Sequence, residues 1–203
     1  MVHPADDIEA RNLLDSERRW SYTAFFQALG HYLADKAERR EFDAMYAYAR
    51  ASLLHYARWM AEHEYPYLEK PERLEYPTET WAAQDLRKSD VFYLAAAETS
   101  GEERTRFAER GAFFARTSLR TLESMPTRRL TRPVVLLLSH GWLHHLWARR
   151  GSWPLPVTVP ALSDEPRSAE FVTQKSIAKR RAGALAVAAL VALIAAAGWL
   201  FWR

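Results

Sequence analysis

The feature that most constrains this chain is a run of uncharged, mostly apolar residues close to its C-terminus. Residues 182–202 read AGALAVAALVALIAAAGWLFW, which is 21 residues without a charged side chain. A helix of about 20 such residues can cross the hydrocarbon core of a bilayer. We therefore expect one C-terminal transmembrane helix. Two alternatives stay open, a buried alanine-rich core helix and a helix that lies on the membrane surface, although the run has no polar face.

The charges that flank the run predict its orientation. A single basic residue, Arg203, follows it, whereas four precede it, at Lys175, Lys179, Arg180 and Arg181. Basic residues are enriched on the cytoplasmic side of membrane helices. The N-terminus has no apolar run of the kind found in secretory signals. We expect a tail-anchored protein with the rest of the chain in the cytoplasm.

The overall charge does not favour a nucleic-acid partner. The chain has 28 Lys and Arg against 25 Asp and Glu, but five of the basic residues flank the apolar run. Without them, 23 basic residues face 25 acidic ones. A nucleic-acid binder normally carries a basic patch on its folded domain. The absence of cysteine excludes disulfides, thiolate metal sites and cysteine nucleophiles.

Over residues 1–150, apolar residues recur at helical spacing, and no stretch alternates between apolar and polar residues as a strand does. The sequence therefore predicts an all-α fold of antiparallel helical hairpins. The expected helices cover 6–34 (one helix or two), 41–63, 78–98, 100–124 and 131–150. We expect a helical domain over 1–150, a proline-rich linker over 151–173, and a basic juxtamembrane segment with the membrane helix over 174–203.

The least generic stretch is 65–90, where a proline-rich loop leads into a helix. Pro66, Pro71 and Pro77 keep the loop out of helical geometry. Thr78 and Thr80 can accept hydrogen bonds from free backbone N–H groups, so a helix should begin there. The first turns of this helix are dense in polar and aromatic side chains. That density makes a functional site plausible.

Two carboxylates, Glu79 and Asp85, are the candidate catalytic residues, because paired carboxylates perform acid–base or nucleophilic steps in glycoside chemistry. They lie six positions apart and so do not stack on one helical face. The competing interpretation is structural. In that interpretation Glu79 stabilises the helix N-terminus, and Asp85 forms an i, i+3 ion pair with Lys88.

The aromatic and basic residues of the stretch suggest substrate contacts. Trp81, Tyr76 and Tyr67 could form a platform for a sugar ring, or could instead anchor the loop to the core. Arg87 and Lys88 could hold a carboxylate or phosphate of a substrate, with Gln84 as a further polar contact. The alternative is that the basic side chains are solvated.

A metal site is not expected. His140 and His144 share a helix face, but the glutamate of the H-E-x-x-H pattern is missing and no third ligand is evident. The apolar face of the same helix is expected at Val134, Leu137, Leu138, Trp142 and Leu146. The sequence also contains no glycine-rich phosphate loop, so we predict no cofactor.

The segment EYPTETWAAQDLRKS at 75–89, with the later RPVVLLLSHG, resembles the C-terminal part of bacterial α/α-toroid proteins of the six-hairpin glycosidase-like type. The resemblance covers about 15–150. It implies concentric helical hairpins and carbohydrate binding or cleavage in a central cleft. Together with the predicted membrane tail, we expect a location at the bacterial inner membrane. A closed toroid needs about twelve helices, and this chain has room for about half that number. We therefore expect an arc, which could be a fragment of a larger toroid, an arc that a partner chain completes, or a reduced relative without catalysis.

Two functions follow from these observations. One is a membrane-anchored protein of polysaccharide or glycoside metabolism, with a carbohydrate ligand held in a cleft. The other is a non-catalytic, membrane-tethered module that binds a partner protein. An enzyme should place two carboxylates in one aromatic-lined pocket, whereas a binding module should expose an apolar patch or open groove.

Overall fold

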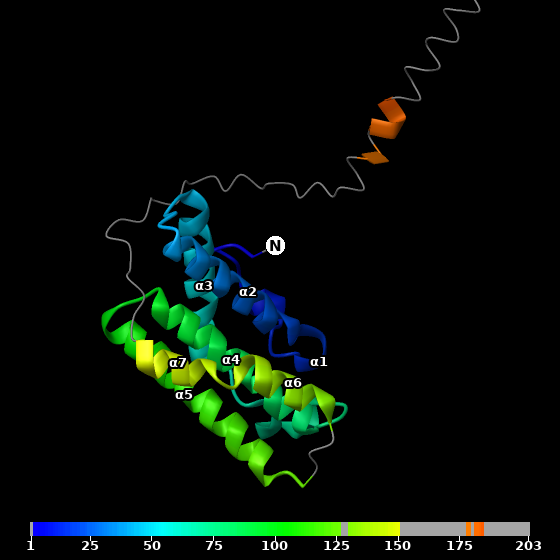
Figure 1. Cartoon of the computed structure of the whole chain (residues 1–203). Helices are drawn as coiled ribbons and strands as arrows, with labels where there is room; N and C mark the ends of the chain where they lie inside the picture. The colour runs from blue at the N-terminus through cyan, green and yellow to red at the C-terminus, as the bar shows by residue number, and fades with distance from the viewer. Residues whose placement is uncertain (1, 127–129, 151–177, 180, 185–203) are drawn as a thin grey trace, which may run out of the picture. The chain divides into compact units, whose positions relative to one another are not determined.

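The computed structural model describes residues 2–126, 130–150, 178–179 and 181–184 (Figure 1). Every regular element in these ranges is a helix and none is a strand, which confirms the all-α prediction. The chain divides into two compact units, Met1–Ser163 and Asp164–Arg203. The first contains η1 (Glu9–Arg11), α1 (Ser16–Arg19), α2 (Ser21–Glu38), α3 (Ala44–His63), η2 (Tyr67–Glu69), η3 (Pro71–Arg73), α4 (Glu79–Ala97), α5 (Gly101–Ser124), α6 (Thr131–His140) and α7 (Leu143–Arg150).

Helix α4 is the centre of the first unit. It packs against α2, α3, α5, α6, α7 and η2, and Figure 1 shows the other long helices arranged around it. As a result, 16 of its 19 residues are buried. A helix in such a position is usually apolar all round. Helix α4 instead carries buried charged and amide side chains, and their partners decide what the stretch does.

Small residues let the neighbouring helices approach α4 closely. A Cβ atom added to Gly30 of α2 would lie 2.7 Å from the side chain of Leu94. On the other side, Ser89 donates a hydrogen bond to the carbonyl of Gly111 (2.8 Å), and Ser118 donates to the carbonyl of Ala82 (2.7 Å). These contacts fix α2 and α5 against α4 without an intervening layer of large side chains.

The junction of α4 and α5 is a tight turn. Gly101 adopts a φ of +60°, a left-handed conformation that suits glycine. Ser100 and Glu103 have the spacing of a capping box, but no such box forms, since the Ser100 side chain makes no cap hydrogen bond. Glu103 accepts hydrogen bonds from Arg58 of α3 instead, at 2.6 and 3.3 Å. The two-bond geometry of a guanidinium on a carboxylate explains why this contact is preferred.

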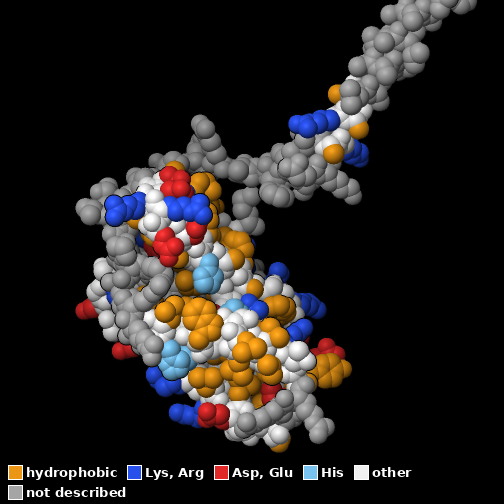
Figure 2. All heavy atoms as spheres, viewed as in Figure 1, with side chains coloured by type: hydrophobic (Ala, Val, Ile, Leu, Met, Phe, Trp, Pro, Cys, Tyr) orange, Lys and Arg blue, Asp and Glu red, His pale blue; other side chains and the backbone are white. Residues whose placement is uncertain are grey.

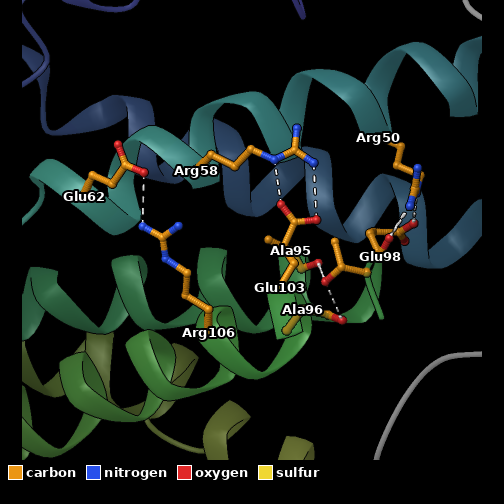
Figure 3. A network of polar contacts seen from close by, with 9 residues as sticks. Arg50, Arg58, Glu62, Ala95, Ala96, Glu98, Glu103 and Arg106 are labelled. Carbon is orange, nitrogen blue, oxygen red and sulfur yellow. Dashed lines mark hydrogen bonds and ion pairs between the residues drawn. The ribbon is translucent and has the colours of Figure 1, made fainter. Parts of the chain in front are cut away.

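Figure 3 shows a row of arginine contacts that join α3 to the α4–α5 region. Arg58 binds Glu103, Arg106 binds Glu62 at 3.2 Å, and Arg50 donates to the carbonyl of Glu98 at 2.6 Å. The Arg58 and Arg106 pairs lie at the surface, where an ion pair contributes about 0–1 kcal/mol. They orient the helices more than they stabilise them.

Two expected helices are interrupted. The segment 6–34 contains η1, α1 and most of α2, and Asn12 takes a left-handed φ of 48° after η1. The segment 131–150 divides into α6 and α7 around Gly141, a residue with low helix propensity. The other expected helices agree with α3, α4 and α5 to within a few residues.

Within the described residues, no helix is both long and apolar enough to cross a membrane. Most of the predicted span, at 185–202, lies outside those residues, and so does the predicted linker at 151–173. Residues 178–179 and 181–184 of the second unit are helical.

Candidate functional site

The proline-rich loop lies against α4 and is held there by a buried cluster around Lys88. The Lys88 ammonium contacts a carboxylate oxygen of Glu64 at 2.8 Å and one of Asp85 at 3.1 Å. It also donates to the carbonyl of Tyr65 at 2.6 Å and lies 3.4 Å from the centre of the Tyr67 ring. Lys88 has no exposed surface. We call Glu64, Asp85, Lys88 and Tyr67 the Lys88 cluster.

Neighbouring groups complete the hydrogen bonding of the cluster's carboxylates. The backbone N–H of Tyr67 donates to Asp85 at 3.1 Å, and the hydroxyl of Tyr22 on α2 donates to Glu64. Arg110 of α5 donates to the carbonyl of Glu64 at 2.6 Å. Four separate parts of the chain therefore meet at this cluster. A buried charge of either sign is stable only when it is paired in this way.

Burial and charge act in opposite directions on the ionisable groups of the cluster. Burial raises the pKa of Asp85 to about 6, and the charge of Lys88 offsets only part of this effect. Burial alone would lower the pKa of Lys88, but the charges of Asp85 and Glu64 outweigh it and raise that pKa. Burial, together with the charge of Glu64, raises the pKa of Tyr22. The cluster has two carboxylates and one ammonium, so one negative charge is not neutralised by Lys88.

The Lys88 cluster is closed to solvent, since Asp85 is 2% exposed and Glu64 is 6% exposed. The i, i+3 ion pair that the spacing of Asp85 and Lys88 allowed is formed. Both side chains are therefore engaged with each other rather than directed at a ligand. Their arrangement fastens the loop to α4.

Gln84 and Arg87 belong to a second group of polar side chains on α4. Arg87 donates to Gln84 at 2.9 Å and to Gln27 of α2 at 2.6 Å. Gln27 in turn donates to Asp90 at 2.6 Å. His140 of α6 lies 2.8 Å from the same Asp90 carboxylate. Burial raises the pKa of Asp90, an effect that the His140 hydrogen bond partly offsets. This chain of contacts ties α2, α4 and α6 together.

The aromatic residues of the stretch do not share one surface. Trp81 packs edge-on against Tyr67, with the ring centres 5.1 Å apart, and Tyr67 itself is buried. Tyr76 lies in the loop and is 69% exposed. Trp81 and Tyr67 thus match the loop-anchoring alternative, while Tyr76 faces solvent.

Glu79 is separate from both groups. It lies in the first turn of α4 and lines a cavity of about 330 Å³ between the start of α4, the end of α5 and α6. Asp85 is not among the residues of this cavity, which we call the Glu79 pocket. Its walls are aliphatic apart from two carboxylates, and consist of Glu79, Leu119, Leu122, Glu123, Leu130, Pro133, Val134 and Leu137.

Sequence reasoning missed the partners that decide the chemistry of α4. Glu64, Tyr22 and Gln27 lie on other helices, and nothing in their local sequence marks them as partners of α4. No metal site is expected at His140 from the sequence, but the sequence also does not reveal its contact with Asp90. Across the described ranges, no three or more His, Cys, Asp or Glu side chains are grouped so as to hold a metal ion.

No protein-family model matches the chain, and neither a curated protein nor a solved structure matches it significantly. A proposal of function therefore has to rest on the side chains described above and on the sequence of the tail.

Proposed function

We propose that this protein is a non-catalytic, membrane-tethered helical module that binds a partner protein through one face of α6. The observation that carries the proposal is a strip of exposed apolar side chains on and just after that helix. We call it the α6 face, and it consists of Val134, Val135, Leu138 and Trp142.

Helix α6 is apolar on two opposite sides. Its inner side buries Pro133 and Leu136 against α4. Its outer side leaves Leu138 74% exposed, and the other three residues of the α6 face are 47–51% exposed. Figure 2 shows hydrophobic side chains gathered over this helix. A helix that is apolar all round is normally covered on both sides, and an exposed apolar patch commonly marks an interaction site.

The described carboxylates give less support to carbohydrate cleavage. Asp85 is buried and paired with Lys88, and it does not line the pocket of Glu79. That pocket has a second carboxylate, Glu123, but its other walls are aliphatic. A sugar site would be expected to offer aromatic faces beside its acids. If the chain derives from a toroid, as the sequence resemblance suggests, the partner would cover α6 and extend the helical layer.

The tether is proposed from the sequence of the tail. The uncharged run 182–202 and the basic residues before it favour a single span at the bacterial inner membrane with the helical domain on the cytoplasmic side. Sodium carbonate washing of membranes that carry the full chain tests this part. The chain should stay in the pellet, and its release into the wash would refute the span.

Site-specific photo-crosslinking of the full chain in cells tests partner binding. A photoreactive amino acid replaces Leu138 in one variant and Arg18, an exposed residue of α1, in the control. We expect one defined protein to crosslink at Leu138, not at Arg18, and to be lost when Val135→Glu is added. A reciprocal crosslink from the identified protein should reach the α6 face. Equal crosslinking at both positions, or insensitivity to Val135→Glu, would refute the proposal.

A further inference from the structure

The Glu79 pocket combines apolar walls with a carboxylate that has no partner among the described residues. Glu79 is 7% exposed, yet it forms no hydrogen bond or ion pair with any described residue through its side chain. Every other buried carboxylate of α4 is paired, Asp85 with Lys88 and Asp90 with His140 and Gln27. Glu79 is thus the exception on the central helix.

Among the described residues that line this pocket, the two charged side chains are both acidic. Glu123 lines the same pocket and is exposed, and none of the described residues of the pocket is Lys or Arg. The Glu79 oxygens are not among the fully buried side-chain atoms that lack a hydrogen-bond partner, so they are not sealed from solvent. An ammonium or guanidinium that reached them through the pocket would make a charge-assisted hydrogen bond. The aliphatic walls suit the methylene stem of such a side chain. The pocket therefore selects a group that is apolar along its length and cationic at its tip.

The pocket is continuous with the α6 face. Val134 belongs to both, since it lines the pocket and is 47% exposed. Leu130, which also lines the pocket, is 39% exposed. An occupant of the pocket therefore emerges directly onto the apolar strip. This continuity favours a segment of a bound protein over a free amine, because a free amine would leave Leu138 and Trp142 exposed.

We propose that the Glu79 pocket receives a Lys or Arg side chain from an amphipathic helix of the partner, whose apolar residues lie on the α6 face. This inference rests on the proposed partner binding and adds the chemistry that gives it specificity. Helix-in-groove recognition uses apolar anchors at i, i+3, i+4 and i+7, and one basic residue beside them would fix the register.

Glu79 also occupies the first turn of α4, where the helix dipole favours a negative charge. A purely structural role of this kind predicts that Glu79→Gln lowers stability and leaves binding unchanged. A recognition role predicts that Glu79→Gln removes the preference of the pocket for a cationic peptide and changes stability little. The two roles are therefore separated by measuring binding and unfolding on the same variants.

The test uses the full chain in phosphatidylcholine nanodiscs and a set of synthetic 14-residue amphipathic helices. Each peptide carries leucines at i, i+3, i+4 and i+7 and, at one scanned position, either arginine or its neutral isostere citrulline. Fluorescence anisotropy gives the dissociation constants, and empty nanodiscs correct for lipid binding. The variants are Glu79→Gln and, as the matched control, Glu72→Gln in the exposed part of the loop.

We expect at least one register in which the arginine peptide binds about tenfold more tightly than the citrulline peptide. That preference should disappear in Glu79→Gln and persist in Glu72→Gln. Equal affinities for both peptides, or no peptide binding at all, would overturn the inference. A third outcome separates the two proposals. If the wild type binds both peptides equally and Leu138→Glu binds neither, partner binding at the α6 face stands and the role of the pocket is refuted.

Discussion

The Lys88 cluster and the Glu79 pocket lie on the same helix, and their carboxylates differ in one respect. Asp85 is surrounded by donors from its own chain, whereas Glu79, six positions earlier, has none among the described residues. The first arrangement is complete without a ligand, so its polar groups stabilise the fold. The second leaves an unpaired charge beside exposed apolar side chains, which is what a binding surface requires.

This contrast shows how buried polar residues on a central helix should be interpreted. A high density of charged and amide groups is typical of active sites, but it also arises when a central helix must be tied to several neighbours. What distinguishes the two cases is whether each group has a partner. On α4, that criterion favours a structural role for Asp85 and Lys88 and is consistent with the recognition role that we propose for Glu79.

Replacing Lys88 with methionine should cause the largest loss of stability. The change leaves Glu64 and Asp85 buried without a cation, and breaking a buried ion pair in this way costs about 3–5 kcal/mol. Urea unfolding of the full chain in detergent, followed by tryptophan fluorescence, measures the loss. Lys70→Met, in the same loop, is the control and should cost less than about 1 kcal/mol, because Lys70 is partly exposed. A similar small loss for Lys88→Met would show that the cluster does not hold the loop.

Asp85→Asn should change how stability depends on pH. The pKa of Asp85 is about 6 in the folded protein, against 3.8 for an unperturbed aspartate such as that of the unfolded chain. The folded state therefore binds the proton more tightly. The contribution of Asp85 to stability is therefore most favourable below about pH 4 and declines as the pH rises towards 6. The difference in unfolding free energy, wild type minus Asp85→Asn, should fall by up to roughly 3 kcal/mol over that range.

Asp90 and Glu98 also have pKa values raised by burial, but both are present in the wild type and in Asp85→Asn. Their effects cancel in the difference between the two proteins. A difference that stays flat or rises between pH 4 and 6 would mean that the pKa of Asp85 is not raised.

His140→Ala should loosen α6 locally. The histidine lies 2.8 Å from the buried Asp90 carboxylate, so its removal costs about 1–2 kcal/mol and weakens the attachment of α6 to α4. Hydrogen exchange should show faster exchange at the amides of α6 and little change in α3. His145→Ala, which removes an exposed ring of α7, should leave the protection of α6 as it is in the wild type. Equal effects of the two substitutions would show that His140 does not anchor the helix.

Leu138→Ser should have the smallest effect on stability. The side chain is 74% exposed, and exposed positions usually change the unfolding free energy by less than about 0.5 kcal/mol. Leu136→Ala, two residues earlier and 3% exposed, should cost about 2–5 kcal/mol. Thermal unfolding of both variants, monitored by circular dichroism, measures the contrast. Losses of similar size would mean that the α6 face is already covered within this chain.

Much of the fold could be predicted from local sequence signals. The apolar spacing of α3 gave its extent to within a few residues, since Phe42 to Met60 follow one helical face. The break expected between the helices 78–98 and 100–124 agrees with the junction of α4 and α5 at Gly101. The i, i+3 spacing of Asp85 and Lys88 allowed the ion pair that forms. Each of these signals lies within one turn or one helix, where spacing determines geometry.

The candidate site could not be predicted in the same way, because it depends on contacts between helices. Glu64 lies 24 positions from Lys88, and Gln27 lies 63 positions from Asp90. No periodicity reports such pairs. Val134 and Leu138 were expected as the apolar face of their helix, but sequence alone does not say whether such a face meets a core or solvent. The membrane helix and the toroid relationship stay predictions.

The paired groups on α4 also have a consequence for the register of the central helix. In the observed alignment of α4, the Lys88 ammonium contacts Glu64 and the Tyr65 carbonyl at 2.8 and 2.6 Å. A shift of α4 by one turn, about 5.4 Å, would leave these groups without partners. We infer that the Lys88 cluster makes the observed alignment of α4 more stable than shifted alignments. Replacing Glu64 and Asp85 with leucine and Lys88 with methionine together should then preserve the melting temperature but broaden the amide resonances of α4, as several alignments become populated. Sharp resonances in that triple variant would show that the small residues facing α4 set its alignment unaided.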